Sequence, residues 1–164
     1  MAKLVQIAHR YRDVKNYVYR RYGGVKSISK ITPGYEIQKE LIGEGYREKS
    51  GLPSVYFQNA LYDALTDMRG DLEKTKQKIR KAIYDNENLS EKDGHYLRFV
   101  LSLDKTFIAV LEHKPVELSA KFMKPYLEIS KEVDAEKLDS YLRRHHHRWK
   151  SKVSILWGRN AGKM

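Results

Sequence analysis

Apolar residues recur along most of the chain at the three- and four-residue spacing that marks one face of a helix. The clearest stretch follows Pro53 and runs from Ser54 to Tyr84 without a proline. Its apolar positions are Leu61, Leu65, Met68, Leu72, Ile79 and Ile83. This pattern predicts one long helix, over about residues 54–84, whose apolar stripe belongs to the core.

Shorter stretches with the same spacing are separated by glycine and proline. They predict helices over 4–22, 35–42 and 135–150, with one further turn over 27–31. Ser90 and Asp93 have the spacing of a capping box, which opens another helix at Glu91. We expect two helices from there, over 91–102 and 105–113, and one continuous helix is the alternative.

The pattern is weaker in two places. Between Val116 and Val133 the apolar residues suit a helix or a strand, and Pro125 argues against a long helix. Val153–Trp157 is apolar enough for a short strand. The expected fold is therefore mainly α, a helical bundle with one long helix and room for a minor β element near the C-terminus. Because repeats and low-complexity linkers are absent, we expect one domain over 1–158 and a frayed tail over 159–164.

Composition narrows the class of protein. None of the apolar runs approaches the roughly 20 residues that span a bilayer, so no membrane association is expected. The first residues, 1–6, lead into a polar stretch rather than the apolar core of a secretion signal. The chain has no cysteine, which excludes disulfides, thiol catalysis and a zinc ribbon and fits a cytoplasmic protein.

The charge balance indicates a polyanionic partner. Thirty-two Lys and Arg residues oppose 21 Asp and Glu, giving a formal net charge of +11. Residues 140–164 contain seven of the basic residues and none of the acidic ones. We expect this C-terminal cluster to contact phosphate groups, and a disordered basic tail is the alternative. Its candidate binding residues are Arg143, Arg144, Arg148, Trp149, Lys150 and Lys152.

The first predicted helix mixes basic and aromatic residues in a way that suits nucleic acid. Arg and Lys can follow a phosphate backbone while an aromatic ring stacks on an unpaired base. The candidates there are Arg10, Arg12, Lys15, Tyr17, Arg20 and Arg21. The alternative is that the tyrosines anchor this helix in a core while the basic residues face water.

No pattern in the sequence indicates catalysis, a metal or a cofactor. Three successive histidines, 145–147, point in different directions on a helix and cannot converge on one ion. Asp63, Asp67 and Asp71 share one helix face, which we interpret as solvated, and we interpret the basic run over 74–81 in the same way. Phosphate-binding loops and hydrolase motifs are missing. We therefore expect a protein that is not an enzyme.

Four segments carry a family resemblance. DVKNYVYRRY (13–22) and LPSVYFQNALYDAL (52–65) together resemble the N-terminal part of the transposon-encoded OrfB/TnpB proteins, RNA-guided DNA nucleases akin to type V CRISPR effectors. NLSEKDGHYLRFVL (88–101) and LDSYLRR (138–144) resemble a Gram-positive branch of that family. The likeness covers about residues 11–148 and rests on short motifs.

The resemblance implies a helical recognition lobe that holds guide RNA and the RNA–DNA duplex. Carried over by position, it points to Asn16, Tyr17, Arg20, Gln58, Asn59, Arg143 and Arg144. The sequence departs from the family because it lacks the first barrel strand, the acidic nuclease motifs and the four-cysteine zinc ribbon. The chain is then a nuclease-free remnant, an engineered fragment or a free-standing relative.

Two functions remain open at this point. The first is a nucleic-acid-binding module for RNA or an RNA–DNA hybrid, without catalytic activity. The second is a helical interaction protein of a mobile element or phage, which grips a protein partner.

Overall fold

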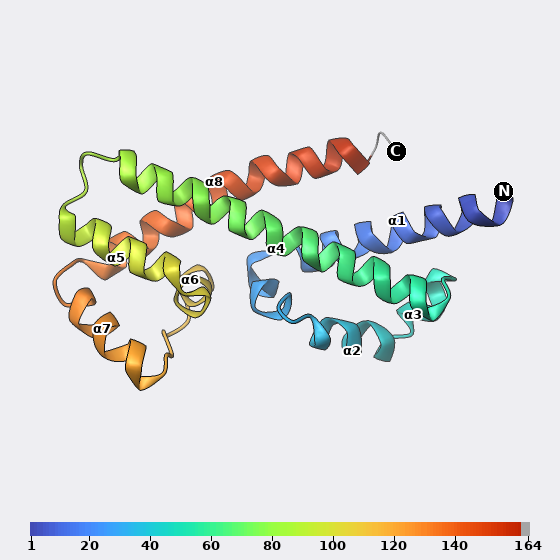
Figure 1. Cartoon of the computed structure of the whole chain (residues 1–164), viewed down its shortest axis with the longest axis horizontal. Coiled ribbons are helices and arrows are strands. Elements are labelled where there is room, and N and C mark those ends of the chain that lie inside the picture. The colour runs from blue at the N-terminus through green and yellow to red at the C-terminus, as the bar shows by residue number, and fades with distance from the viewer. Residues whose placement is uncertain (162–164) are drawn as a thin grey trace. The chain divides into compact units, whose positions relative to one another are not determined.

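A computed structural model describes the backbone of residues 1–161 and the side chains of residues 1–148. Within this part, eight α-helices and one 3₁₀ helix follow one another without a strand (Figure 1). The prediction of a mainly α helical bundle is confirmed. None of the helices described is long and apolar enough to cross a membrane.

The chain divides into two compact units, residues 1–72 and residues 73–164. The boundary falls inside the longest helix, α4 (Ser54–Asp85), which contributes its first part to one unit and its last part to the other. This division does not test whether the two units fold together, so the expectation of a single domain stays a prediction.

Unit 1 combines the first part of α4 with the helices that precede it. These are α1 (Ala2–Tyr22), η1 (Val25–Lys30), α2 (Tyr35–Gly43) and α3 (Tyr46–Ser50). Its core is apolar, as the stripe on α4 predicts, and includes Val14, Val18, Ile37, Leu41, Phe57, Leu61 and Leu65. Leu65 also explains Gly34, whose φ is +87°, because a Cβ there would come within 2.4 Å of Leu65 Cδ1.

Unit 2 packs the last part of α4 with four further helices. These are α5 (Glu91–Ser102), α6 (Asp104–Leu111), α7 (Ala120–Ser130) and α8 (Ala135–Ala161). The predicted cap of α5 is present, since Ser90 Oγ accepts a hydrogen bond from the Asp93 N–H at 3.1 Å. Leu103 has extended backbone angles and separates α5 from α6, which confirms two helices rather than one.

The hydroxyls of two buried side chains form hydrogen bonds that fix the helices of unit 2. Thr106 is fully buried, and its hydroxyl donates to the backbone carbonyls of Val100 and Leu103, at 2.6 and 2.8 Å. The hydroxyl of Tyr96 on α5 donates to Asp139 on α8 at 2.6 Å. Burial raises the pKa of Asp139, and the bond from Tyr96 partly offsets that rise. These hydrogen bonds satisfy polar groups inside an apolar core, where unpaired polar groups would be costly.

Two segments that were uncertain in the sequence are helical. Residues 120–130 form α7, which contains Pro125 and is only 11 residues long. The strand expected over 153–157 is wrong, because the backbone there belongs to α8. Without a neighbouring strand to pair with, an extended segment leaves its backbone groups unsatisfied, whereas a helix satisfies them internally. Of the expected tail, residues 159–161 complete α8 and 162–164 lie outside the described residues.

Candidate nucleic-acid interface

The tyrosines of α1 are held by acidic residues of α4. The hydroxyl of Tyr11 donates a hydrogen bond to Asp63, and the hydroxyl of Tyr19 donates to Asp67. Lys15 Nζ lies 3.2 Å from Asp67 Oδ2 in an ion pair. Asp63 and Asp67 are exposed, as the interpretation of a solvated face predicts, and both also join α4 to α1.

These contacts change the chemistry of the tyrosines. Burial, followed by the hydrogen bond to Asp63, raises the pKa of Tyr11 to about 12. Burial and the bond to Asp67 raise the pKa of Tyr19 as well. A tyrosine with the ordinary pKa of 10.0 is already protonated at neutral pH, so the raised pKa values extend the donor role of both hydroxyls into alkaline solution.

Arg21 is likewise committed within unit 1. Its guanidinium donates to Glu40 at 2.9 Å, to Glu44 at 2.6 Å and to the hydroxyl of Tyr17 at 3.0 Å. The ring of Tyr17 stacks on that of Tyr46, with centroids 4.1 Å apart and an angle of 19°. One face of Tyr17 is thus occupied by another ring instead of facing a base.

The remaining candidates of unit 1 differ in exposure. Arg10 donates a hydrogen bond to the backbone carbonyl of Gly51 at 2.9 Å. The guanidinium of Arg12 forms an ion pair with Asp13, with Nη2 and Oδ1 3.8 Å apart. Asn16 is half-buried. The exposed candidates are Arg20, Gln58 and Asn59. The structure therefore does not gather the predicted residues of α1 into one exposed basic surface.

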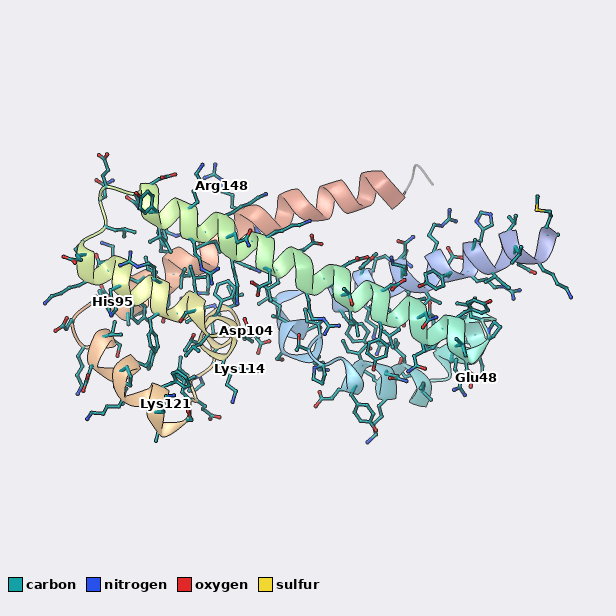
Figure 2. All side chains as sticks on the ribbon, in the orientation of Figure 1. Glu48, His95, Asp104, Lys114, Lys121 and Arg148 are labelled. Carbon is teal, nitrogen blue, oxygen red and sulfur yellow. The ribbon has the colours of Figure 1, made fainter. Side chains whose placement is uncertain are left out.

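The basic residues of α8 begin at the edge of the core and continue beyond it. Arg143 is half-buried and donates to the backbone carbonyl of Val110 at 3.1 Å, which anchors α8 to α6. Arg144 and Arg148 are exposed, and Figure 2 labels Arg148 on α8. Trp149, Lys150 and Lys152 stand on the helical backbone of α8, and their side chains lie outside the described residues.

The three histidines of α8 lie in different environments, as the helical geometry predicts. His146 is buried, and its ring meets the Phe107 ring edge-on at 6.0 Å. The ring of His145 packs against that of Tyr141, with the ring centroids 4.2 Å apart. Burial, followed by the nearby charges of Arg148 and Arg144, lowers the pKa of His145. Among residues whose side chains are described, no group of three or more His, Asp or Glu is placed to hold a metal ion.

The basic run over 74–81 is not uniformly solvated. Lys76 is only 3% exposed, and its ammonium bonds to Asp104, which Figure 2 labels, and lies 3.4 Å from Glu73. Arg80 donates to the backbone carbonyl of Leu101 at 3.3 Å. Lys74, Lys78 and Lys81 are exposed and form a stripe that the sequence reasoning missed. The i, i+4, i+7 spacing of these three lysines is the sequence pattern that indicates a shared helix face. Lys76 and Arg80, which lie between them, make the basic run look evenly spread around the helix.

Comparison with protein-family models finds no match, and the searches of curated proteins and of solved structures find none either. The resemblance to OrfB/TnpB proteins therefore stays a prediction.

Proposed function

We propose that this chain binds nucleic acid through the basic segment of α8, defined here as residues 140–161. The observation that carries the proposal is that α8 continues as one helix through this segment, which contains no acidic residue. Its basic residues are Arg143, Arg144, Arg148, Lys150, Lys152 and Arg159. Phosphate contacts by such residues release condensed counterions, and this release drives binding to nucleic acids of any sequence.

The helical state of the segment favours an ordered contact over a disordered basic tail. On a helix, successive residues are 100° apart, so the basic residues point to several sides of the axis. A rod of this kind places charge against more than one phosphate at a time. We propose that contacts to the backbone, rather than to base edges, provide most of the affinity.

The ligand expected from the family resemblance is RNA or an RNA–DNA hybrid. A chain without catalytic motifs would hold this ligand and leave any chemistry to other proteins. We propose a cytoplasmic location for it, in keeping with the absence of cysteine.

One observation favours the second candidate, a protein–protein interaction module. The first two turns of α1 expose apolar side chains, with Leu4 67% and Val5 54% exposed. Exposed apolar residues that cluster on one helix are typical of surfaces that dock a partner. A helical interaction protein of a mobile element or phage would use this end of unit 1.

The test is the salt dependence of binding to labelled single-stranded RNA and to an RNA–DNA hybrid, measured by fluorescence anisotropy on nuclease-treated protein. The logarithm of the affinity should fall linearly with the logarithm of the salt concentration, with a slope of about −0.7 to −0.9 for each phosphate contact. Flat affinity across salt, or the absence of binding at low salt, would contradict the proposal. A stable complex with another protein, without retained nucleic acid, would support the second candidate.

A further inference from the structure

A hollow of about 310 Å³ lies in unit 2, between α5 and the end of α7. Its volume is at the lower end of the range of small-molecule sites, about 300–1,000 Å³. The residues that line this α5/α7 hollow are Glu91, Lys92, His95, Arg98, Ile129 and Glu132. The lining is mostly polar, with one apolar side chain from α7, so it suits a small ligand that carries charge and has an aliphatic part.

The charged residues of the lining divide into a paired and an unpaired set. Lys92 and Glu132 form an ion pair, with Nζ and Oε2 3.6 Å apart. Glu91 and Arg98 are exposed, and among the side chains that the structure describes they have no ion-pair partner. The hollow therefore presents one carboxylate and one guanidinium that are available to a ligand.

Gly94 determines where the guanidinium of Arg98 lies. A Cβ at residue 94 would come within 3.0 Å of Arg98 Nη1, so the arginine side chain runs back along α5 and lies over this glycine. Glycine is unfavourable inside a helix relative to alanine, and here its lack of a side chain leaves room for the guanidinium. The guanidinium is thus brought to about one helical turn from Glu91, roughly 5 Å along the axis.

The balance of charge in the hollow excludes a polyanion as its ligand. A phosphate chain would gain a contact with Arg98 but would also meet the carboxylates of Glu91 and Glu132. Three charged residues adjacent in sequence to the lining, Asp93, Glu128 and Lys131, do not line the hollow and together carry one net negative charge. A ligand that carries both signs of charge can satisfy Glu91 and Arg98 at once.

We propose that the α5/α7 hollow binds an aliphatic chain with a carboxylate at one end and an ammonium group at the other, as in a C-terminal lysine. Arg98 donates hydrogen bonds to the carboxylate, and the ammonium group donates to Glu91. The methylene groups between them cover Ile129, and their length is comparable to the one helical turn that separates the two protein charges. His95, labelled in Figure 2, lies between Glu91 and Arg98 along α5.

This inference does not rest on the proposed binding of nucleic acid, because none of the lining residues belongs to α8. The same pair of charged groups occurs in a C-terminal lysine of another protein and in free lysine. Free lysine has a second ammonium group beside its carboxylate, and this group is repelled by Arg98. The geometry therefore favours the C-terminal lysine.

The experiment follows the backbone amide signals of the full chain by NMR while a small ligand is added. Nα-acetyl-lysine reproduces a C-terminal lysine, and Nα-acetyl-lysine amide reproduces an internal lysine because it lacks the carboxylate. Nα-acetyl-lysine should shift signals of α5 and α7, and the amide should bind about fivefold more weakly, the scale of one partly exposed ion pair. Hexanoate, which lacks the ammonium group, should be weaker by a similar factor. Free lysine should bind more weakly than Nα-acetyl-lysine, and tighter binding would assign the hollow to the free amino acid.

Two variants test the roles of the charged residues. Arg98→Gln should abolish the preference for Nα-acetyl-lysine over its amide, and Glu91→Gln should weaken the binding of both. The controls are Arg20→Gln and Glu36→Gln, at exposed positions of unit 1, which should change neither affinity. Glu36 lies in the first turn of α2 as Glu91 lies in the first turn of α5, so the control also matches the loss of an acid from a helix N-terminus.

The outcomes decide the proposal without reference to nucleic acid. Equal binding of Nα-acetyl-lysine and its amide would show that Arg98 holds no carboxylate and would overturn the site. The absence of shifts in α5 and α7, or an affinity that Glu91→Gln leaves unchanged, would overturn it as well. The salt dependence of binding to RNA tests the proposed function of α8 separately, so either proposal can fail while the other stands.

Discussion

Helices α1 and α8 look alike in composition, yet the fold uses their charge differently. α1 and the basic segment of α8 each carry six Lys and Arg residues over similar lengths. In α1, Lys15 pairs with Asp67, and Arg21 pairs with Glu40 and Glu44. The basic segment of α8 contains no acidic residue, whereas three carboxylates of unit 1 pair with α1: Asp67 of α4, Glu40 of α2 and Glu44, which follows α2.

A basic helix offers a polyanion only the charge that the fold has not already paired. Each ion pair within unit 1 replaces a contact that a phosphate would otherwise make. The same holds for the tyrosines of α1, which donate to Asp63 and Asp67. The ion pairs and hydrogen bonds give α1 a role in architecture, the proposed function places binding on α8, and the following experiments test that division.

The largest expected effect is on binding through α8. Replacing Arg144, Arg148, Lys150 and Lys152 by Ala should lower the slope of log affinity against log salt by about 2.8–3.6, from four contacts at about 0.7–0.9 each. Arg143 is kept because it anchors α8 to the carbonyl of Val110. Salt titrations of wild type and variant give the slopes, and circular dichroism checks the fold. An unchanged slope would make α8 a solvated helix rather than an interface.

The next effect is on stability and concerns the core beside α1. Leu65 is fully buried in unit 1, so Leu65→Ala should lower the free energy of unfolding by about 2–5 kcal/mol. Urea denaturation measures the loss. Val55→Ala, at an exposed position of the same helix, is the control and should cost far less. A Leu65→Ala variant as stable as the wild type would mean that the apolar stripe is not the core.

A smaller effect separates two neighbouring arginines of α1. Arg21→Ala should lower the free energy of unfolding by up to about 1 kcal/mol, because its pairs with Glu40 and Glu44 are partly exposed. Arg20→Ala, at an exposed neighbouring position, should leave stability unchanged. Neither variant should alter the salt slope of binding. If Arg21→Ala reduced that slope, α1 would share the interface with α8.

The smallest effect is a dependence of stability on alkaline pH. The pKa of Tyr11 in the fold is about 12, above the ordinary value of 10.0, so the folded state holds this proton more tightly than the unfolded state. Its contribution is complete below pH 10 and is lost as the pH rises towards 12. Thermal melts between pH 9 and 12 should show a steeper decline for wild type than for Tyr11→Phe. Parallel declines would show that the bond to Asp63 adds nothing to stability.

The elements of the fold were largely predictable because their signals are local. The long helix was placed within a residue of its ends by Pro53 and the uninterrupted apolar stripe. The start of α5 followed from Ser90, whose cap needs only three residues of chain. The short helix α3 was missed, since its five residues bury no side chain and show no period. The end of α8 was misjudged because a short apolar run suits a helix and a strand equally.

The candidate interface was less predictable because pairing joins residues far apart in sequence. Lys15 and Asp67 are 52 residues apart, and no pattern within α1 shows that its charge is compensated. Lys76 is similar, since only the fold reveals that it is buried and paired with Asp104, which is 28 residues away in the sequence. The spacing of residues in the sequence indicates which of them share a face of a helix. Which residues pair with that face depends on the tertiary structure.

The continuity of α4 has a consequence for how this molecule can be divided. Because the boundary between the two units falls within a single run of helix, a cut there would create two new helix ends. Each new end would lose partners for up to four backbone groups, and neither piece would inherit a capping residue. Fragments meant to isolate either unit should therefore overlap, so that each carries all of residues 54–85. The same restriction would apply to recombination between genes, which could exchange either unit only by taking α4 whole.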